Sequence, residues 1–230
     1  GSRAQAQAES GAGDGAAVTY YVDSLNGDDS KAGTAASSAW RSLDKVNGLS
    51  FGPGDRILFK RGCAWEGQLN PRGSGAAGSP IIIDSYGSDG GAPVINGNGV
   101  DGAAVLLRNQ QYWEICNLEI TNQAEINTGE RQGVILAGDD GSTLQHIYLK
   151  NLYIHDIIGY EYESNDSGIF CWVSDDTCMN DIQIDSCVVE GCTGRGIFTI
   201  SYNFGDYDGL SGGSFFNTVI TNNILDHNGG

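Results

Sequence analysis

The amino-acid sequence predicts an all-β chain folded as a parallel β-helix. One pattern recurs with steps of 34, 35 and 36 residues, counted between Asn117, Asn151, Ser186 and Asn222. Within each repeat apolar and polar residues alternate, which is typical of strands and not of helices. The 230 residues include 35 glycines and 4 prolines, with 40% hydrophobic residues, which is a turn-rich but globular composition. A repeat that keeps its apolar positions aligned while its loops vary in length indicates a solenoid.

The N-terminal part divides into a linker and a helix. Residues 1–17 begin with Gly-Ser and continue with small and polar residues, so we expect a tag scar and linker there, followed by a single domain over residues 18–230. Residues 37–46, SSAWRSLDKV, space Trp40, Leu43 and Val46 as a short amphipathic helix. Such a helix would cover the open end of the solenoid.

The strands follow in order. Three segments supply the first of them: GDRILFKRG, GSPIIIDSYG and APVINGNG. Each later repeat contains two strands joined by a tight bend, with apolar columns at Ile115, Leu149, Ile184 and Ile220, and at Ile120, Ile154, Val189 and Leu225. The Asn or Ser of each repeat lies at the bend, where stacked amides can satisfy one another. Another strand opens with glycine, at Gly133, Gly168 and Gly196. No capping segment follows at the C-terminal end, which is consistent with a chain truncated within the solenoid.

Charge and cysteine content exclude several function classes. The formal net charge of −17, with a pI near 4.2, would repel nucleic acid and anionic membranes. No apolar run is long enough for a membrane span. The six cysteines show no metal-ligand spacing, and sequence does not fix whether they pair. We expect a monomeric protein that is secreted or extracellular/periplasmic. Its acidic residues either only keep the surface soluble or form part of a site that binds sugars.

Acidic loops follow the glycine-initiated strands. Each begins with a pair of aspartates, which are Asp139 and Asp140, Asp175 and Asp176, and Asp206 and Asp208. Neighbouring coils lie about 4.8 Å apart, so these carboxylates should crowd along one edge. The repulsion between such close carboxylates must be relieved by a bound cation, by a shared proton or by side chains that point away from one another. The alternatives are ordinary polar loop chemistry, a Ca²⁺ site formed by these six aspartates, or a general acid and base for hydrolysis.

Aromatic side chains provide a second indication of a sugar site. If Ile169, Cys171 and Val173 point into the core, then Phe170 and Trp172 point outward, as does Phe198 on the next coil. Exposed aromatic faces suit the C–H faces of sugar rings. The alternative is that the loop over residues 157–167 folds over these side chains and buries them.

The N-terminal segments YYVDSLNGDDSKAGT, AWRSLDKV and PGDRILFKRG, with GSPIIIDSYG and PVINGNG, resemble secreted proteins of the pectate lyase-like superfamily, with polysaccharide lyase families nine and six as the nearest kinds. The resemblance covers residues 18–230. It implies a right-handed helix of three parallel sheets, with the glycine-initiated strands in the first sheet and the Asn ladder between the second and third. In those lyases Ca²⁺ neutralises a uronate carboxylate while a base removes the C5 proton.

The resemblance therefore implies a Ca²⁺-assisted polysaccharide lyase that cleaves a uronate-containing glycan by β-elimination. Asp139, Asp140, Asp175 and Asp176 resemble the metal-binding cluster of those lyases. Asp139 and Asp175 are also candidate catalytic residues, and Arg195 is the nearest candidate base. Two alternatives stay open. One is a glycoside hydrolase with paired aspartates, and the other is a surface β-helix that binds glycan without cleaving it.

Overall fold

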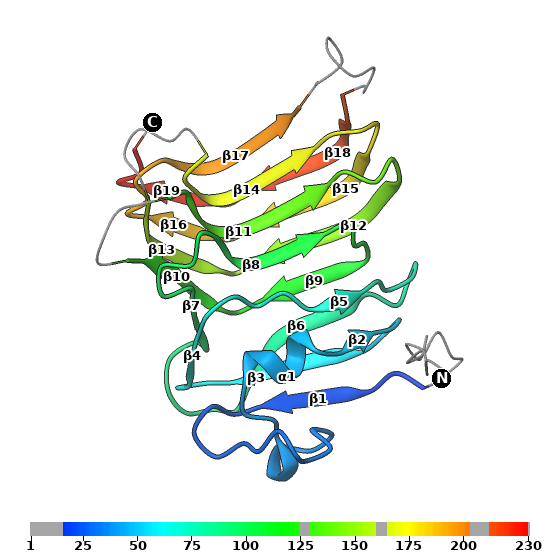
Figure 1. The fold of residues 1–230 in the computed structure, drawn as a ribbon, viewed down its shortest axis with the longest axis vertical. Helices are drawn as coiled ribbons and strands as arrows, with labels where there is room; N and C mark the ends of the chain where they lie inside the picture. Colours follow the sequence, from blue (N-terminus) through cyan, green and yellow to red (C-terminus); the bar gives the residue numbers. More distant parts are fainter. Residues whose placement is uncertain (1–15, 125–128, 160–164, 203–211, 230) are drawn as a thin grey trace, which may run out of the picture.

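The chain forms a parallel β-helix, as the sequence predicts. A computed structural model describes residues 16–124, 129–159, 165–202 and 212–229. In Figure 1 the coils stack from the N-terminal end to the C-terminal end, and every strand pair within a sheet is parallel. The sequence repeat therefore corresponds to one coil of the solenoid.

Three sheets run along the solenoid. The first sheet contains β8 (Gly102–Arg108), β11 (Arg131–Gly138), β14 (Ser167–Val173) and β17 (Arg195–Ser201). The second contains β1 (Thr19–Val22), β3 (Arg56–Lys60), β6 (Ile81–Tyr86), β9 (Trp113–Cys116), β12 (Thr143–Lys150), β15 (Cys178–Asp185) and β18 (Ser214–Thr221). The third contains β4 (Ala64–Glu66), β7 (Val94–Asn96), β10 (Glu119–Gln123), β13 (Tyr153–Ile158), β16 (Val188–Glu190) and β19 (Ile224–Asp226). A short pair, β2 (Ser50–Phe51) and β5 (Arg72–Gly73), completes the described strands.

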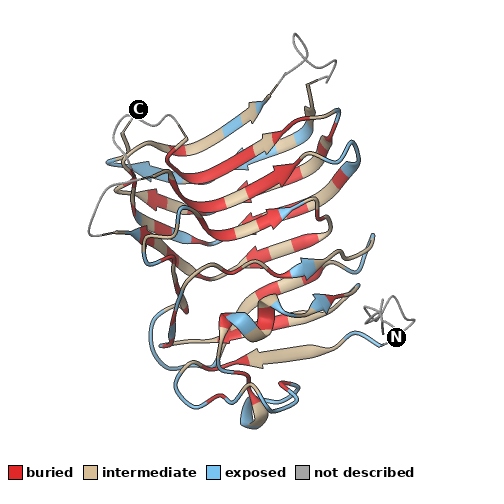
Figure 2. Ribbon diagram, viewed as in Figure 1, coloured by how far each residue is buried: buried red, intermediate tan, exposed pale blue. Residues whose placement is uncertain are grey.

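The apolar columns form the core. Leu149 on β12 is in register with Ile115 on β9 and with Ile184 on β15, and all three are fully buried. Figure 2 shows buried residues in red alternating with more exposed ones along the strands. On the last described coil the same columns end in Ile220 and Leu225, which are exposed. Burial of each column therefore depends on a neighbouring coil on both sides, as expected for a solenoid.

The Asn ladder lies at the bend between the second and third sheets. Asn117, Asn151, Ser186 and Asn222 all have left-handed backbone angles, with φ of 58°, 53°, 57° and 56°. Asn tolerates this conformation better than most residues. The Asn151 amide donates to Asn117 Oδ1, and the Asn117 amide donates to Asp84 Oδ1 at 2.6 Å. The bend thus selects residues with a short polar side chain, and these link successive coils.

The glycines near the start of the first-sheet strands β11, β14 and β17 lie where a side chain has no room. A Cβ on Gly133 would lie 2.6 Å from the Gly168 carbonyl oxygen and 2.6 Å from Ile154 Cγ2. Real Cβ atoms do not approach other atoms that closely, so any larger residue would push two coils apart. Close packing of the strand starts against the third sheet therefore explains this part of the repeat.

The N-terminal cap differs from the prediction. Helix α1 spans only Leu43–Asn47, with Ser42 Oγ accepting a hydrogen bond from the Lys45 amide, and it lies beside β3 in Figure 1. A short 3-10 turn, η1 (Ala36–Ser38), precedes it. The free edge of β1 is instead covered by the loop that joins β1 to α1, because the Tyr21 N–H donates to the Gly33 carbonyl at 2.8 Å and the Trp40 N–H donates to the Tyr21 carbonyl at 2.9 Å. The loop, more than the helix, satisfies the backbone groups at that end.

The cysteines are free thiols, so none of the pairings left open by the sequence is present. Cys187 is fully buried and packs as a small apolar residue. In the parts of the chain that the structure describes, no helix has the length and apolar character needed to cross a membrane.

Candidate functional site

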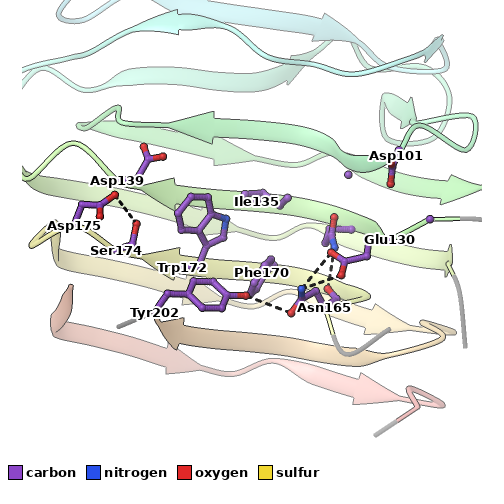
Figure 3. A pocket seen from close by; sticks show the side chains of 13 residues that line it. Asp101, Glu130, Ile135, Asp139, Asn165, Phe170, Trp172, Ser174, Asp175 and Tyr202 are labelled. Atoms are coloured by element: carbon purple, nitrogen blue, oxygen red, sulfur yellow. Dashed lines mark hydrogen bonds between the residues drawn. The ribbon is translucent and has the colours of Figure 1, made fainter. Parts of the chain in front are cut away.

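A groove runs along the outer face of the first sheet. It has a volume of about 1050 Å³ and is shown in Figure 3. Its lining comes from four coils and consists of Asp101, Gly102, Gly129, Glu130, Gln132, Ile135, Asp139, Asn165, Phe170, Trp172, Ser174, Asp175 and Tyr202. Carboxylates lie at both ends, and apolar and aromatic side chains lie between them. Such a combination, an apolar floor with a few polar groups, is typical of a ligand-binding cleft.

The floor of the groove arises from strand alternation. Ile135 on β11 is in register with Phe170 on β14. The residues on either side of Phe170, Ile169 and Cys171, face the core. Phe170 stacks on Phe198 of the next coil, with ring centres 5.2 Å apart and planes within 4°. Phe170 is buried, with 4% exposed, while Trp172 is partly exposed. The structure thus places Phe170 and Trp172 in the groove, whereas Phe198 stacks beside Phe170 on the next coil and is not among the lining residues.

Tyr202 extends the floor towards the C-terminal coil. Its ring meets Trp172 edge to face at 6.1 Å. Arg108 lies on the other side of Trp172, with its guanidinium carbon 5.8 Å from the ring centre. Trp172 is therefore held between a cation and an aromatic ring and keeps one exposed part for a ligand.

Asp139 lies at one end of the groove, directly after β11. Arg108 forms an ion pair with it through both carboxylate oxygens. The Asn109 amide also donates to Asp139 Oδ1 at 2.7 Å, and Asn109 Oδ1 accepts from the Asp139 backbone N–H at 2.9 Å. Mainly through the hydrogen bond from Arg108, this arrangement lowers the pKa of Asp139 below its ordinary value. Asp139 is therefore a fixed, ionised carboxylate.

Asp175 lies at the same end, after β14. Its backbone has a left-handed φ of 52°, and its Oδ2 accepts a hydrogen bond of 3.1 Å from Ser174 Oγ. Its Oδ1 is buried and has no hydrogen-bond partner among the described residues. An unpaired buried acceptor is costly, and residues in strained backbone conformations cluster at functional sites. Asp139 and Asp175 thus provide two carboxyl groups on adjacent coils with different surroundings.

The other predicted metal ligands are not brought to the groove. Asp140 and Asp176 are exposed and do not line it. Asp206 and Asp208 lie outside the described residues. Within the described ranges no three His, Cys, Asp or Glu side chains are placed to hold a metal ion. Arg108 already binds both oxygens of Asp139, so the described residues alone do not supply the six to eight oxygens that Ca²⁺ takes. The calcium hypothesis stays a prediction.

Arg195, the predicted base, begins β17 and is in register with Ser167 at the start of β14. Asp175 follows the other end of β14, so strand rise places about 20 Å between the two ends. The Arg195 guanidinium lies 4.1 Å from the Phe198 ring. The structure therefore does not bring Arg195 together with Asp139 and Asp175.

The opposite end of the groove contains residues that the sequence analysis missed. Asn165 Nδ2 donates to both oxygens of Glu130, at 3.0 and 3.2 Å, and Gln132 Nε2 donates to the Asn165 carbonyl at 2.9 Å. Asp101 lies beside them. These residues precede the opening glycines of the first-sheet strands. A repeated polar position just before each glycine, as in GERQG and SNDSG, was the available signal.

Comparisons with known proteins find similarity to lacto-N-biosidases. No protein-family model matches the chain. A lacto-N-biosidase of Bifidobacterium longum subsp. longum is 33% identical over 199 residues, covering 64% of this chain and 12% of that protein. The solved GH136 lacto-N-biosidase of Eubacterium ramulus, as its selenomethionine derivative, superimposes with a TM-score of 0.80 at 26% identity, over 93% of this chain and 42% of that one. Its native form gives 0.73 at 24% identity, over 89% and 40%.

These comparisons correct the predicted reaction. Both relatives are named lacto-N-biosidases, a kind of glycoside hydrolase, so the prediction of a polysaccharide lyase acting by β-elimination is wrong, and the alternative of a hydrolase is the one they favour. A likeness to carbohydrate-active β-helix proteins is confirmed. Membership of the pectate lyase-like superfamily stays a prediction. The chain spans less than half the length of either relative.

Proposed function

We propose that this chain forms the glycan-binding groove of a glycoside hydrolase of the lacto-N-biosidase kind, acting on glycans that contain lacto-N-biose. The observation that carries the proposal is the groove itself, in which Asp139 and Asp175 border an aromatic floor. The similarity to two lacto-N-biosidases supports the choice of substrate. A secreted or periplasmic location would suit such a glycan and is part of the proposal.

Hydrolysis of a glycosidic bond needs two carboxyl groups with different roles. One donates a proton to the leaving oxygen, and the other, ionised, attacks the anomeric carbon or activates water. Arg108 and Asn109 keep Asp139 ionised and oriented, so Asp139 is assigned as the nucleophile or base. Asp175 is the remaining carboxyl group at this end and is assigned as the acid. Adjacent coils thereby supply both roles.

The aromatic floor would hold the sugar next to these groups. Trp172 presents a partly exposed ring between Arg108 and Tyr202. An aromatic ring buries a large apolar area against the C–H face of a pyranose at little entropy cost. Ile135 and Phe170 continue this surface towards the other end.

The test is an assay of the chain with p-nitrophenyl lacto-N-bioside and with a free glycan that carries lacto-N-biose. We expect release of the disaccharide with a new reducing end and without the ultraviolet absorbance of an unsaturated sugar. Asp139→Asn and Asp175→Asn should each lower kcat by at least 100-fold. Asp140→Asn is the matched control, because Asp140 is exposed, lies outside the groove and should leave turnover unchanged.

Two results would contradict the proposal in different ways. Turnover that survives both Asp139→Asn and Asp175→Asn would remove these residues from the reaction. Glycan binding without any turnover would instead favour the non-catalytic alternative, a β-helix that binds glycan without cleaving it.

A further inference from the structure

Asparagine is followed directly by glycine at five positions, which are Asn26, Asn47, Asn96, Asn98 and Asn228. Such a pair is chemically labile, because glycine has no side chain to hinder the attack of its backbone nitrogen on the asparagine side-chain carbonyl carbon. The attack requires a nitrogen that is free of a hydrogen bond and an asparagine side chain that can turn towards it. The structure meets both conditions at one of the five pairs.

Four of the pairs are held by hydrogen bonds. The N–H groups of Gly27, Gly48, Gly97 and Gly229 donate to carbonyl oxygens at 2.8, 2.9, 2.7 and 2.9 Å. Three of the side chains are held as well, because a backbone N–H donates to the Oδ1 of Asn47, Asn96 and Asn228. A hydrogen-bonded amide is released only when the structure opens locally. The four glycine nitrogens are therefore protected.

Asn98 and Gly99 lie at the centre of a tight turn between β7 and β8. The turn is closed by a hydrogen bond of 3.1 Å from the Val100 N–H to the Gly97 carbonyl. Its two central residues have positive φ, 52° at Asn98 and 75° at Gly99, as in a type I′ turn. The Gly99 N–H makes no bond within this turn and donates to no group among the described residues. The attacking nitrogen is therefore free.

The Asn98 side chain is free to turn as well. It is exposed, and its amide makes one long hydrogen bond, from Nδ2 to Glu66 Oε2 at 3.5 Å. The attack needs a rotation of the peptide that joins Asn98 to Gly99, and the closing hydrogen bond of the turn resists that rotation. Opening a short exposed turn costs much less free energy than opening a packed coil. The reactive arrangement is therefore accessible while the solenoid stays folded.

We propose that Asn98 is a site of spontaneous covalent modification, at which the side-chain amide is lost through a cyclic imide. The Gly99 nitrogen bonds to Asn98 Cγ, the Cγ–Nδ2 bond breaks, and the proton of the Gly99 nitrogen passes through water to the departing ammonia. A water molecule then opens the imide at either carbonyl, which gives aspartate or isoaspartate. The site lies outside the groove, so the proposal does not depend on the proposed function.

The products would change a contact between two coils. Glu66 at the end of β4 is in register with Asn96 at the end of β7, which brings the Asn98 side chain to the Glu66 carboxylate. A carboxylate in place of the Asn98 amide would put a like charge there instead of a hydrogen-bond donor. Isoaspartate would also lengthen the backbone of the turn that leads from β7 to β8. The modified chain therefore carries one more negative charge and separates from the original on anion exchange.

Peptide mapping by mass spectrometry tests the proposal. The full chain is incubated at mildly alkaline pH, folded or in denaturing urea, and the mass increase of one dalton is followed at all five asparagines. In the folded chain we expect Asn98 to react about tenfold or more faster than each of the other four, because their glycine N–H groups are hydrogen-bonded. In urea this protection is lost, so the five rates should converge.

Two variants assign the signal to Asn98. Asn98→Asp provides the chromatographic standard for the aspartate product. Asn98→Gln keeps the amide but would have to close a larger ring, so the anion-exchange shift of the folded chain should disappear. Gly99→Ala is a poorer test, because its Cβ would lie 2.5 Å from the Ala124 Cβ and would disturb the turn itself.

The result that supports the proposal is reaction at Asn98 in the folded chain, with an anion-exchange shift that Asn98→Gln lacks. A rate at Asn98 no higher than at the four hydrogen-bonded pairs would overturn it. A folded chain in which Asn98 stays intact while all five sites react in urea would overturn it too, since the turn would then protect Asn98 as the hydrogen bonds protect the others.

Discussion

Arg108 at the end of β8 donates to Asp139, which directly follows β11 on the next coil. The register explains the contact, because Arg108 pairs with Ala137, two residues before the aspartate. The same guanidinium lies over Trp172. One side chain therefore joins the acidic end of the groove to its aromatic floor, and both should respond when it is changed.

Replacing Arg108 with Gln should move the pH dependence of hydrolysis. Without the guanidinium the pKa of Asp139 rises towards its ordinary value, so the carboxylate becomes protonated at a higher pH. A base must be ionised to act, so the acid limb of kcat/KM should shift to higher pH and activity at acidic pH should fall. Arg61→Gln is the control, since Arg61 lies away from the groove and bonds the Gly90 carbonyl. An unmoved acid limb in the Arg108 variant would show that Asp139 is not the base.

Replacing Trp172 with Ala should reduce glycan affinity more than stability. Loss of the stacking surface is expected to raise the dissociation constant of a lacto-N-biose glycan about tenfold. Trp172 is partly exposed, whereas Trp113 is fully buried in the core, so Trp113→Ala should instead cost about 3–5 kcal/mol of unfolding free energy. Calorimetry and urea denaturation measure the two effects. If Trp172→Phe binds no better than Trp172→Ala, stacking is not the source of affinity.

The fold could be predicted from the sequence because the solenoid repeats a local rule. Ile115, Leu149 and Ile184 recur with the same neighbours, and the structure places them in register. The same apolar pattern is therefore seen independently in each coil, which strengthens the prediction. The cap was less predictable, because the spacing of Trp40, Leu43 and Val46 suits a helix while Trp40 is needed instead to pair with the edge of β1.

The groove could be predicted only in part. Strand alternation gives Phe170 and Trp172 an outward direction, and the position of Asp139 and Asp175 after their strands brings them to one end. Whether two groups share a groove end also depends on which end of the strand they occupy, and this separates Arg195 from the aspartates. Glu130 and Asn165 were missed because their hydrogen bond joins neighbouring coils, which only three-dimensional contacts reveal.

The Asn ladder predicts a graded response at Asn151. Asn151→Ala loses the hydrogen bond to Asn117 and forces a Cβ-bearing residue without polar compensation to keep a φ of 53°, so we expect a loss of about 2–3 kcal/mol of unfolding free energy. Asn151→Gly accepts that φ freely and should lose about 1 kcal/mol. Urea denaturation measures both. Equal losses would mean that backbone conformation contributes nothing at this bend.

The ion pair of Asp23 with Lys60 should make the stability of the fold sensitive to acid. Burial alone would raise the pKa of Asp23, but the Lys60 ammonium at 2.6 Å and the backbone N–H groups of Leu25 and Asn26 outweigh it and lower the pKa to about 2. In the unfolded chain the ordinary value is 3.8. Because the folded pKa is the lower one, the stabilisation is fully present above about pH 4 and is lost as the pH falls through about 2.

The size of this effect is about 2 kcal/mol, since Asp23 is 3% exposed and each pKa unit corresponds to about 1.4 kcal/mol. Unfolding free energies from urea titrations at several pH values should therefore fall between about pH 4 and pH 2 in the wild type. Asp23→Asn removes the titrating group, so it should be less stable at neutral pH and show a shallower decline over that interval. Asp89→Asn is the control, because Asp89 lies in an exposed loop. A decline of the same slope in the Asp23 variant and the wild type would assign the acid sensitivity to other carboxylates.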